Sequence, residues 1–333
     1  MKVLGLIASV VMAALLSGCG GTTPPPNDPP PPPMDDSGNA PVAKASNADV
    51  QAGMDAIQNG KFEDAKAALE KARAVDPKDP QAAYYLGVAL ENLGDAAGAE
   101  KSYRDALALD AKLVEASVNL SALLLDASKA KEALEVVEAA LPSAPQDPRL
   151  LMNKALALEA DGQQEPSLAA YADAVKAAPD NVALGIAYGQ VLAAAGKKDD
   201  AIAQLRKVLA SATKAEELAG MGDAFGKLGA FADCVAALDK ALAQAEKPPL
   251  LVRRGVCRHE LKDDKGAQAD YEKAVAVDPK FAAGYFYLGQ HLRALGKKKE
   301  AMTALKKAVE LAGDQGVGAA AQKALDALQG KKK

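Results

Sequence analysis

The sequence contains very few aromatic side chains for its length. Of its 333 residues, 4% are aromatic and none is tryptophan, although 49% are hydrophobic. The apolar content therefore comes from small and aliphatic residues, among which alanine dominates. Closely packed pairs of helices account for this balance better than a mixed sheet, because strands are rich in aromatic and β-branched side chains.

Histidine and cysteine are also scarce, and these residue types supply many catalytic and metal sites. The chain has two histidines, His259 and His291, and three cysteines. His259 follows Cys257 by two residues, but side chains two apart on a helix point in different directions. No second cysteine–histidine cluster completes a zinc site. We therefore expect no catalytic residue, no metal site and no cofactor, and the chain is not predicted to be an enzyme.

Charge of one sign is not concentrated anywhere in the sequence. The formal net charge is −4, from 40 basic and 44 acidic residues, and the basic runs at 297–299 and 331–333 are short. We interpret these lysines as solvated turn and tail residues, with a weak contact to anionic lipid or glycan as the alternative. Neither nucleic acid nor a small-molecule substrate is expected as a partner.

One pattern recurs along most of the chain with a period of 33 or 34 residues. Each unit is predicted to form two helices joined by a tight turn, where glycine is frequent because a positive φ costs it little. A unit this short cannot bury its apolar faces alone, so neighbouring units must stack. Eight units are predicted, starting at Ser46, Pro80, Val114, Pro148, Val182, Ala215, Pro248 and Ala282.

Small residues recur where the two helices of a unit must approach closely. On the first helix they are Gly53, Gly87, Ala155, Gly189, Gly222, Gly255 and Gly289. On the second helix they are Ala65, Ala99, Ala133, Ser167, Ala201, Cys234, Ala267 and Ala301. Larger apolar residues are predicted to fill the seam: Leu69, Tyr103, Val137, Tyr171, Leu205, Leu238, Tyr271 and Leu305.

This pattern resembles the tetratricopeptide repeat, a helix–turn–helix unit of 34 residues. The resemblance covers residues 46–315 and implies an all-α fold, a right-handed α-solenoid of about eight repeats. The sequence departs from it at Ser121, Ser128 and Lys262, where glycine is usual. Residues 316–333 are predicted to contain a C-terminal capping helix, which shields the last apolar face, and a lysine tail.

The N-terminus has the pattern of a bacterial lipoprotein signal peptide, assigned to residues 1–18. A short positive start precedes an apolar, uncharged stretch that is too short for a confident membrane span. The stretch runs into Leu16, Ser17, Gly18 and Cys19, which resemble a lipobox. The expectation is that Cys19 is acylated and anchors the chain to the bilayer. An ordinary signal peptide with a chance cysteine is the alternative.

A proline-rich tether is predicted to follow the lipidated cysteine, over residues 19–45. It holds nine prolines between Gly20 and Ala45, and nothing in it could form a core. Polyproline II extends about 3.1 Å per residue, so such a spacer could lift a globular body away from a membrane. The alternative is a proline-rich ligand for a recognition domain. An outer-membrane anchor facing the periplasm is the expected location, because Gly20 stands where aspartate would favour the inner membrane in enterobacteria.

Cys234 and Cys257 are predicted to lie near each other, on the second helix of unit 6 and the first helix of unit 7. A disulfide between them is one interpretation, since an oxidising compartment permits it. Two buried thiols that replace alanine are the other.

The resemblance also implies a binding surface. In tetratricopeptide repeats, certain positions of each first helix line a concave groove that holds a partner segment. The corresponding residues here are Val50, Met54, Ile57, Tyr84, Val88, Val118, Leu125, Arg149, Met152, Leu156 and Phe286. Their apolar character suggests docking of an amphipathic helix or an extended peptide. The alternative is that some of them pack within the solenoid. Only Asn119 and Arg149 suggest a carboxylate clamp, so that specificity is not expected.

Taken with the anchor, the resemblance implies a protein-interaction adaptor of the bacterial envelope. It is similar to the repeat lipoproteins that act as type IV pilus pilotins or serve gliding motility. Other envelope proteins would be its partners, bound in the groove. The alternative function is a scaffold for peptidoglycan synthases or hydrolases.

Overall fold

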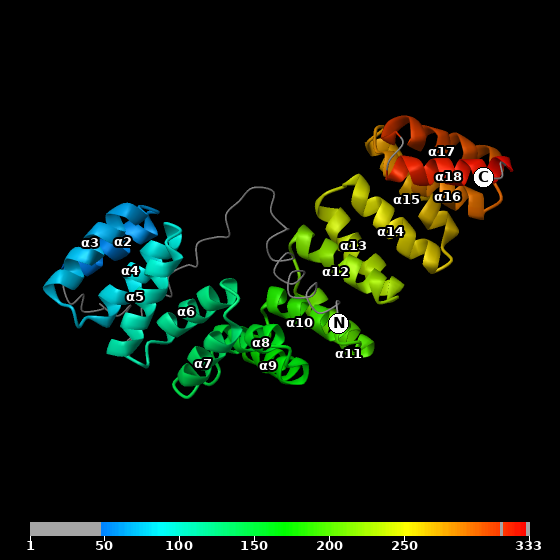
Figure 1. Ribbon diagram of the computed structural model, residues 1–333. Coiled ribbons are helices and arrows are strands. Elements are labelled where there is room, and N and C mark those ends of the chain that lie inside the picture. Colours follow the sequence, from blue (N-terminus) through cyan, green and yellow to red (C-terminus); the bar gives the residue numbers. More distant parts are fainter. Residues whose placement is uncertain (1–47, 314–315, 331–333) are drawn as a thin grey trace. The chain divides into compact units, whose positions relative to one another are not determined.

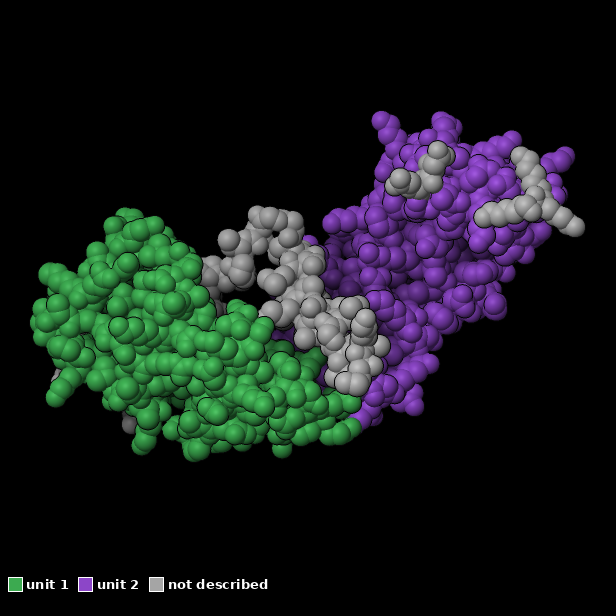
Figure 2. Space-filling model, in the orientation of Figure 1, with its two compact units in different colours: residues 1–179 green, residues 180–333 purple. Residues whose placement is uncertain are grey.

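The computed structural model describes residues 48–313 and 316–330, and every regular element in these ranges is a helix (Figure 1). None of these helices combines the length and apolar character that a bilayer span needs. The chain divides into two compact units, residues 1–179 and 180–333 (Figure 2). The boundary falls between the fourth and fifth predicted repeats.

Unit 1 is a stack of four helical hairpins. The first helices of its hairpins are α2 (Ala48–Gln58), α4 (Pro80–Asn92), α6 (Val114–Asp126) and α8 (Pro148–Ala160). The second helices are α3 (Phe62–Val75), α5 (Ala96–Leu109), α7 (Ala130–Ala140) and α9 (Gln164–Ala177). Each second helix packs on its own first helix, and α3, α5 and α7 also pack on the first helix of the next hairpin.

Unit 2 repeats this arrangement and adds a final helix. Its first helices are α10 (Val182–Ala194), α12 (Ala215–Lys227), α14 (Pro248–Glu260) and α16 (Ala282–Ala294). Its second helices are α11 (Lys198–Leu209), α13 (Phe231–Gln244), α15 (Asp264–Val277) and α17 (Lys298–Ala312). The last helix, α18 (Val317–Gln329), packs on α16 and α17, as predicted for a cap. Seven of the eight first helices begin at the predicted first residue of their unit, and Ser46, the predicted start of the first unit, lies outside the described residues.

The turns inside the hairpins keep a positive φ even where glycine is replaced by another residue. Gly94 has a φ of 79°, in the left-handed region that favours glycine. Ser128 and Lys262 occupy the equivalent turns with φ of 60° and 65°. The geometry of the hairpin is therefore imposed by helix packing even where the residue is unfavourable.

The seam between paired helices is packed as the sequence predicts. A Cβ added to Gly87 would lie 2.5 Å from Cε1 of Tyr103, and one added to Gly255 would lie 2.6 Å from Cε1 of Tyr271. The large seam residues, from Leu69 to Leu305, are at most 3% exposed. Small residues on first helices thus leave the space that large residues on second helices fill.

Candidate functional site

The predicted groove residues of unit 1 lie on its first helices, but four of them form part of the core. Val50, Ile57, Tyr84 and Val88 are between 2% and 9% exposed and belong to one buried cluster. They hold α2 and α4 against their neighbours and offer little surface to a partner. For these four residues, packing within the solenoid is the better interpretation.

The remaining apolar residues are only partly buried. Met54 and Leu125 lie at the edge of the core cluster, and Val118 packs beside Val137 and Leu150. Met152 and Leu156, one helical turn apart on α8, are also partly exposed. We call Met54, Val118, Leu125, Met152 and Leu156 the first-helix face of unit 1. Phe286 lies in unit 2 and packs against the cluster formed by α17 and α18.

Arg149 is exposed, but it already has an anionic partner. Its guanidinium donates to both carboxylate oxygens of Asp147, at 2.7 and 3.2 Å, and lies 4.0 Å from Glu115. The bond to Asp147 is the main cause that raises the pKa of Arg149. Asn119 donates to the hydroxyl of Tyr103 at 3.3 Å. Both residues that could suggest a carboxylate clamp are therefore engaged within the protein.

Two glutamates are held by tyrosines at equivalent places in unit 1. The Tyr103 hydroxyl donates to Glu91 at 2.5 Å, and the Tyr171 hydroxyl donates to Glu159 at 3.0 Å. Burial raises the pKa of both carboxyls above their ordinary range. Each glutamate lies in the last turn of the first helix of its hairpin, so each of these helices carries an acidic group in a poorly hydrated setting near its end.

Unit 1 also has a hollow of about 260 Å³ away from these residues. It is lined by Leu107, Ala111, Ser117, Glu135, Val136, Ala139 and Ala140, from α5, α6, α7 and the α5–α6 turn. None of the predicted groove residues contributes to it.

The structure joins Cys234 of α13 to Cys257 of α14 in a disulfide, with Cα atoms 6.3 Å apart. Both residues are buried. The bond links a second helix to the first helix of the next repeat, across 23 positions of sequence. The predicted lipobox residues Leu16, Ser17, Gly18 and Cys19 lie outside the described residues.

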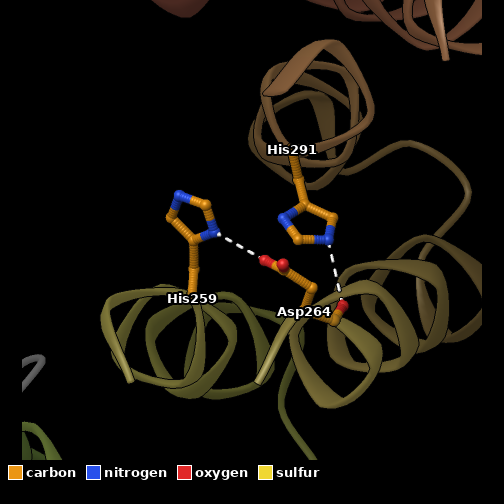
Figure 3. A group of neighbouring side chains, drawn as sticks. All are labelled: His259, Asp264 and His291. Carbon is orange, nitrogen blue, oxygen red and sulfur yellow. Dashed lines mark hydrogen bonds and ion pairs between the residues drawn. The ribbon is translucent and has the colours of Figure 1, made fainter. Parts of the chain in front are cut away.

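The two histidines lie side by side in unit 2, with their ring centroids 5.2 Å apart (Figure 3). His259 lies in the last turn of α14, His291 lies on α16, and Asp264 is the first residue of α15. From the sequence, we considered His259 only together with Cys257 and so did not find the group of His259, Asp264 and His291. The repeat itself carried the signal, because both histidines stand near the ends of first helices in consecutive units.

A family model described as tetratricopeptide repeat matches residues 50–113, 118–182 and 265–316, and a second with the same description matches 248–281. No curated protein matches the chain. Among solved structures, MamA from Desulfovibrio magneticus RS-1 is 27% identical, with a TM-score of 0.46 over 50% of this chain and 97% of that one.

Two further solved structures share the fold. PilW, described as a widely conserved type IV pilus biogenesis factor, is 21% identical with a TM-score of 0.53, over 60% of this chain and 93% of that one. PilF of Pseudomonas aeruginosa is 18% identical with a TM-score of 0.51, over 60% and 91%. At these identities the likeness shows the fold alone.

Proposed function

The chain belongs to the tetratricopeptide repeat family, and on that premise we propose that it is a protein-binding adaptor of the bacterial envelope. Its client would be a segment of another envelope protein that places apolar side chains on the first-helix face of unit 1. The observation that carries this proposal is the set of partly exposed apolar side chains on three first helices, α2, α6 and α8, because packing within the hairpins does not bury them fully.

The surroundings of this face favour one kind of client. Glu91 and Glu159 stand at the ends of α4 and α8, and burial makes the ionised form of each costly. A basic side chain beside either carboxylate would offset that cost. An amphipathic helix with apolar residues on one side and lysine or arginine at its border therefore fits better than an acidic segment.

The proposed location is the periplasmic side of the outer membrane, with Cys19 acylated and residues 20–45 as the tether. The lipobox-like residues Leu16 to Cys19 support this proposal. The Cys234–Cys257 disulfide is consistent with it, since disulfides persist in oxidising compartments. The first test is metabolic labelling with a radioactive fatty acid, in which a Cys19→Ser variant should lose all label. Equal labelling of both proteins would refute lipidation at Cys19.

The client we propose is a component of a pilus or motility machine. The fold shared with PilW makes a pilus-assembly component the first client to examine. A scaffold for peptidoglycan synthases or hydrolases is the second candidate, because a lipid anchor, a tether and a binding face would serve it equally well.

The experiment is a pull-down of the lipidated protein in mild detergent, with mass spectrometry of the captured proteins. The variant is Met152→Glu, which places a charge among the partly exposed residues of α8. Tyr84 is not a suitable probe, because it is 3% exposed and its replacement would disturb the core. Val75→Glu is the control, since Val75 is 68% exposed at the end of a second helix.

Three outcomes are informative. A secretin or motility component that is lost in Met152→Glu but kept in Val75→Glu would support the adaptor proposal. Peptidoglycan enzymes with the same pattern would favour the scaffold. A captured protein that Met152→Glu retains would show that the first-helix face is not the binding surface. Circular dichroism of each variant checks that the helices remain.

A further inference from the structure

The only two histidines of the sequence converge on one aspartate in unit 2. Nδ1 of His259 lies 3.3 Å from Oδ1 of Asp264. Figure 3 shows the ring of His291 above the same carboxylate, with one nitrogen on the side where His259 and Asp264 lie. The three residues come from three successive helices, α14, α15 and α16, so no single helix creates the group.

The hydrogen bond of His291 decides which of its nitrogens is available. Nε2 lies 3.0 Å from the backbone carbonyl oxygen of Asp264. A carbonyl only accepts, so Nε2 carries the proton and Nδ1 of the neutral ring keeps its lone pair. His291 is 4% exposed, and Nδ1 is buried without a hydrogen-bond partner among the described residues. A buried acceptor with no partner needs an explanation.

Metal-binding histidines have this same arrangement. One ring nitrogen binds the metal while the other donates to a carbonyl or carboxylate, which fixes the orientation of the ring. His291 already has the outer hydrogen bond, and its free nitrogen faces the side on which His259 and Asp264 lie.

The spacing of the three groups is close to that of a coordination shell. One ligand atom from each residue lies within 4.8 Å of the others. Bonds of about 2.1 Å place two ligand atoms of a tetrahedral zinc ion roughly 3.4 Å apart. The distance of 3.3 Å between Nδ1 of His259 and Oδ1 of Asp264 is close to that value. Their side chains are 36% and 43% exposed, so both can rotate toward a bound ion.

We propose that His259, Asp264 and His291 form a binding site for a divalent transition metal ion of the zinc type. Two imidazoles and one carboxylate suit such ions, whereas magnesium and calcium prefer oxygen ligands alone. The ion would bind Nδ1 of His259 and Oδ1 of Asp264 in place of the proton between them. It would also bind the unpartnered Nδ1 of His291.

The metal would join the last two repeats, because its ligands belong to α14, α15 and α16. Three protein ligands leave a fourth position, which the exposure of His259 and Asp264 opens to water or to a side chain of a partner. This inference does not depend on the proposed adaptor function.

The test is isothermal titration of the full chain in detergent, freed of metal by a chelator, with zinc chloride. We expect one zinc ion per chain. His259→Ala and Asp264→Asn should each weaken binding by more than about 10-fold, the least that loss of an outer-shell partner costs. These two residues carry the test because they are partly exposed and their replacement should leave the core intact.

Asp263→Asn is the matched control. It makes the same chemical change one residue away, and asparagine caps a helix as well as aspartate does. Zinc should raise the melting temperature of the parent chain and of Asp263→Asn, but not of Asp264→Asn. The proposal is overturned if the parent chain binds no zinc, or if all variants bind it equally, or if magnesium gives the same response as zinc.

Discussion

Arg254 and Asp270 face each other across the packed helices of the seventh repeat and form two hydrogen bonds. Nε and Nη2 of Arg254 donate to the two carboxylate oxygens of Asp270, at 2.9 and 2.5 Å. Asp270 is 2% exposed, and Arg258 donates to it as well, at 3.0 Å. One buried carboxylate of α15 therefore pairs with two guanidinium groups of α14.

Replacing Asp270 with alanine should destabilise unit 2 strongly. Removing one partner of a buried ion pair leaves charge without compensation, which costs about 3–5 kcal/mol. Asp239→Ala is the control, because Asp239 also binds Arg254 but its side chain is 49% exposed, and loss of an exposed pair costs about 1 kcal/mol or less. Urea unfolding followed by circular dichroism measures both. Equal losses would contradict the central role of Asp270.

Gly87→Ala should destabilise unit 1 although alanine is the better helix former. The added Cβ would lie 2.5 Å from the Tyr103 ring, and overpacking of this kind costs about 1–3 kcal/mol. Gly220→Ala tests the opposite case, because Gly220 is in α12 and its new Cβ would have no atom within 4 Å beyond the adjacent residues and backbone of its own helix. That variant should gain up to about 1 kcal/mol from helix propensity. Thermal unfolding distinguishes the two signs.

Loss of the proton of Glu91 should make the free energy of unfolding fall as pH rises. Burial raises the pKa of Glu91 above its ordinary value of 4.5, and Asp126 adds to the shift, while the bond from Tyr103 opposes it. The folded state thus keeps a proton that the unfolded state has lost. The free energy of unfolding therefore decreases from about pH 4.5 upward, until the folded-state pKa is passed.

Glu91→Gln should flatten that decrease, because glutamine does not titrate. Urea unfolding at a series of pH values between acid and neutral gives the slope for each protein. Glu70→Gln, a change at an exposed position of α3, is the control and should leave the slope as it is in the parent. A slope unchanged by Glu91→Gln would show that this carboxyl titrates alike in both states.

Reduction of the Cys234–Cys257 disulfide should lower the melting temperature of unit 2. The bond closes a loop of 23 positions, for which the chain-entropy model gives roughly 3 kcal/mol. Alkylation with and without reductant, followed by mass spectrometry, measures the thiols, and calorimetry measures the shift. A Cys234→Ala, Cys257→Ala variant should melt at the temperature of the reduced protein, with no further response to reductant.

The periodic part of this molecule could be predicted from the sequence because its causes are local and repeated. The spacing of Gly87, Gly94 and the equivalent residues predicts hairpin boundaries, since a helix pair needs a small residue at the seam and a turn at a fixed distance from it. The same reasoning predicted that Tyr103 and Tyr271 would be buried, and the structure confirms it.

Only the tertiary structure shows which side chains of a helix face a neighbouring helix, because this depends on their angular position around the helix axis. Spacing alone does not tell whether Tyr84 or Met152 faces a neighbouring helix or solvent, because stacking decides how much of each first helix is covered. Likewise, the packing of three successive helices brings together His259, Asp264 and His291. The sequence by itself thus determined the repeat, and packing between repeats decided which side chains are buried, paired or left to bind.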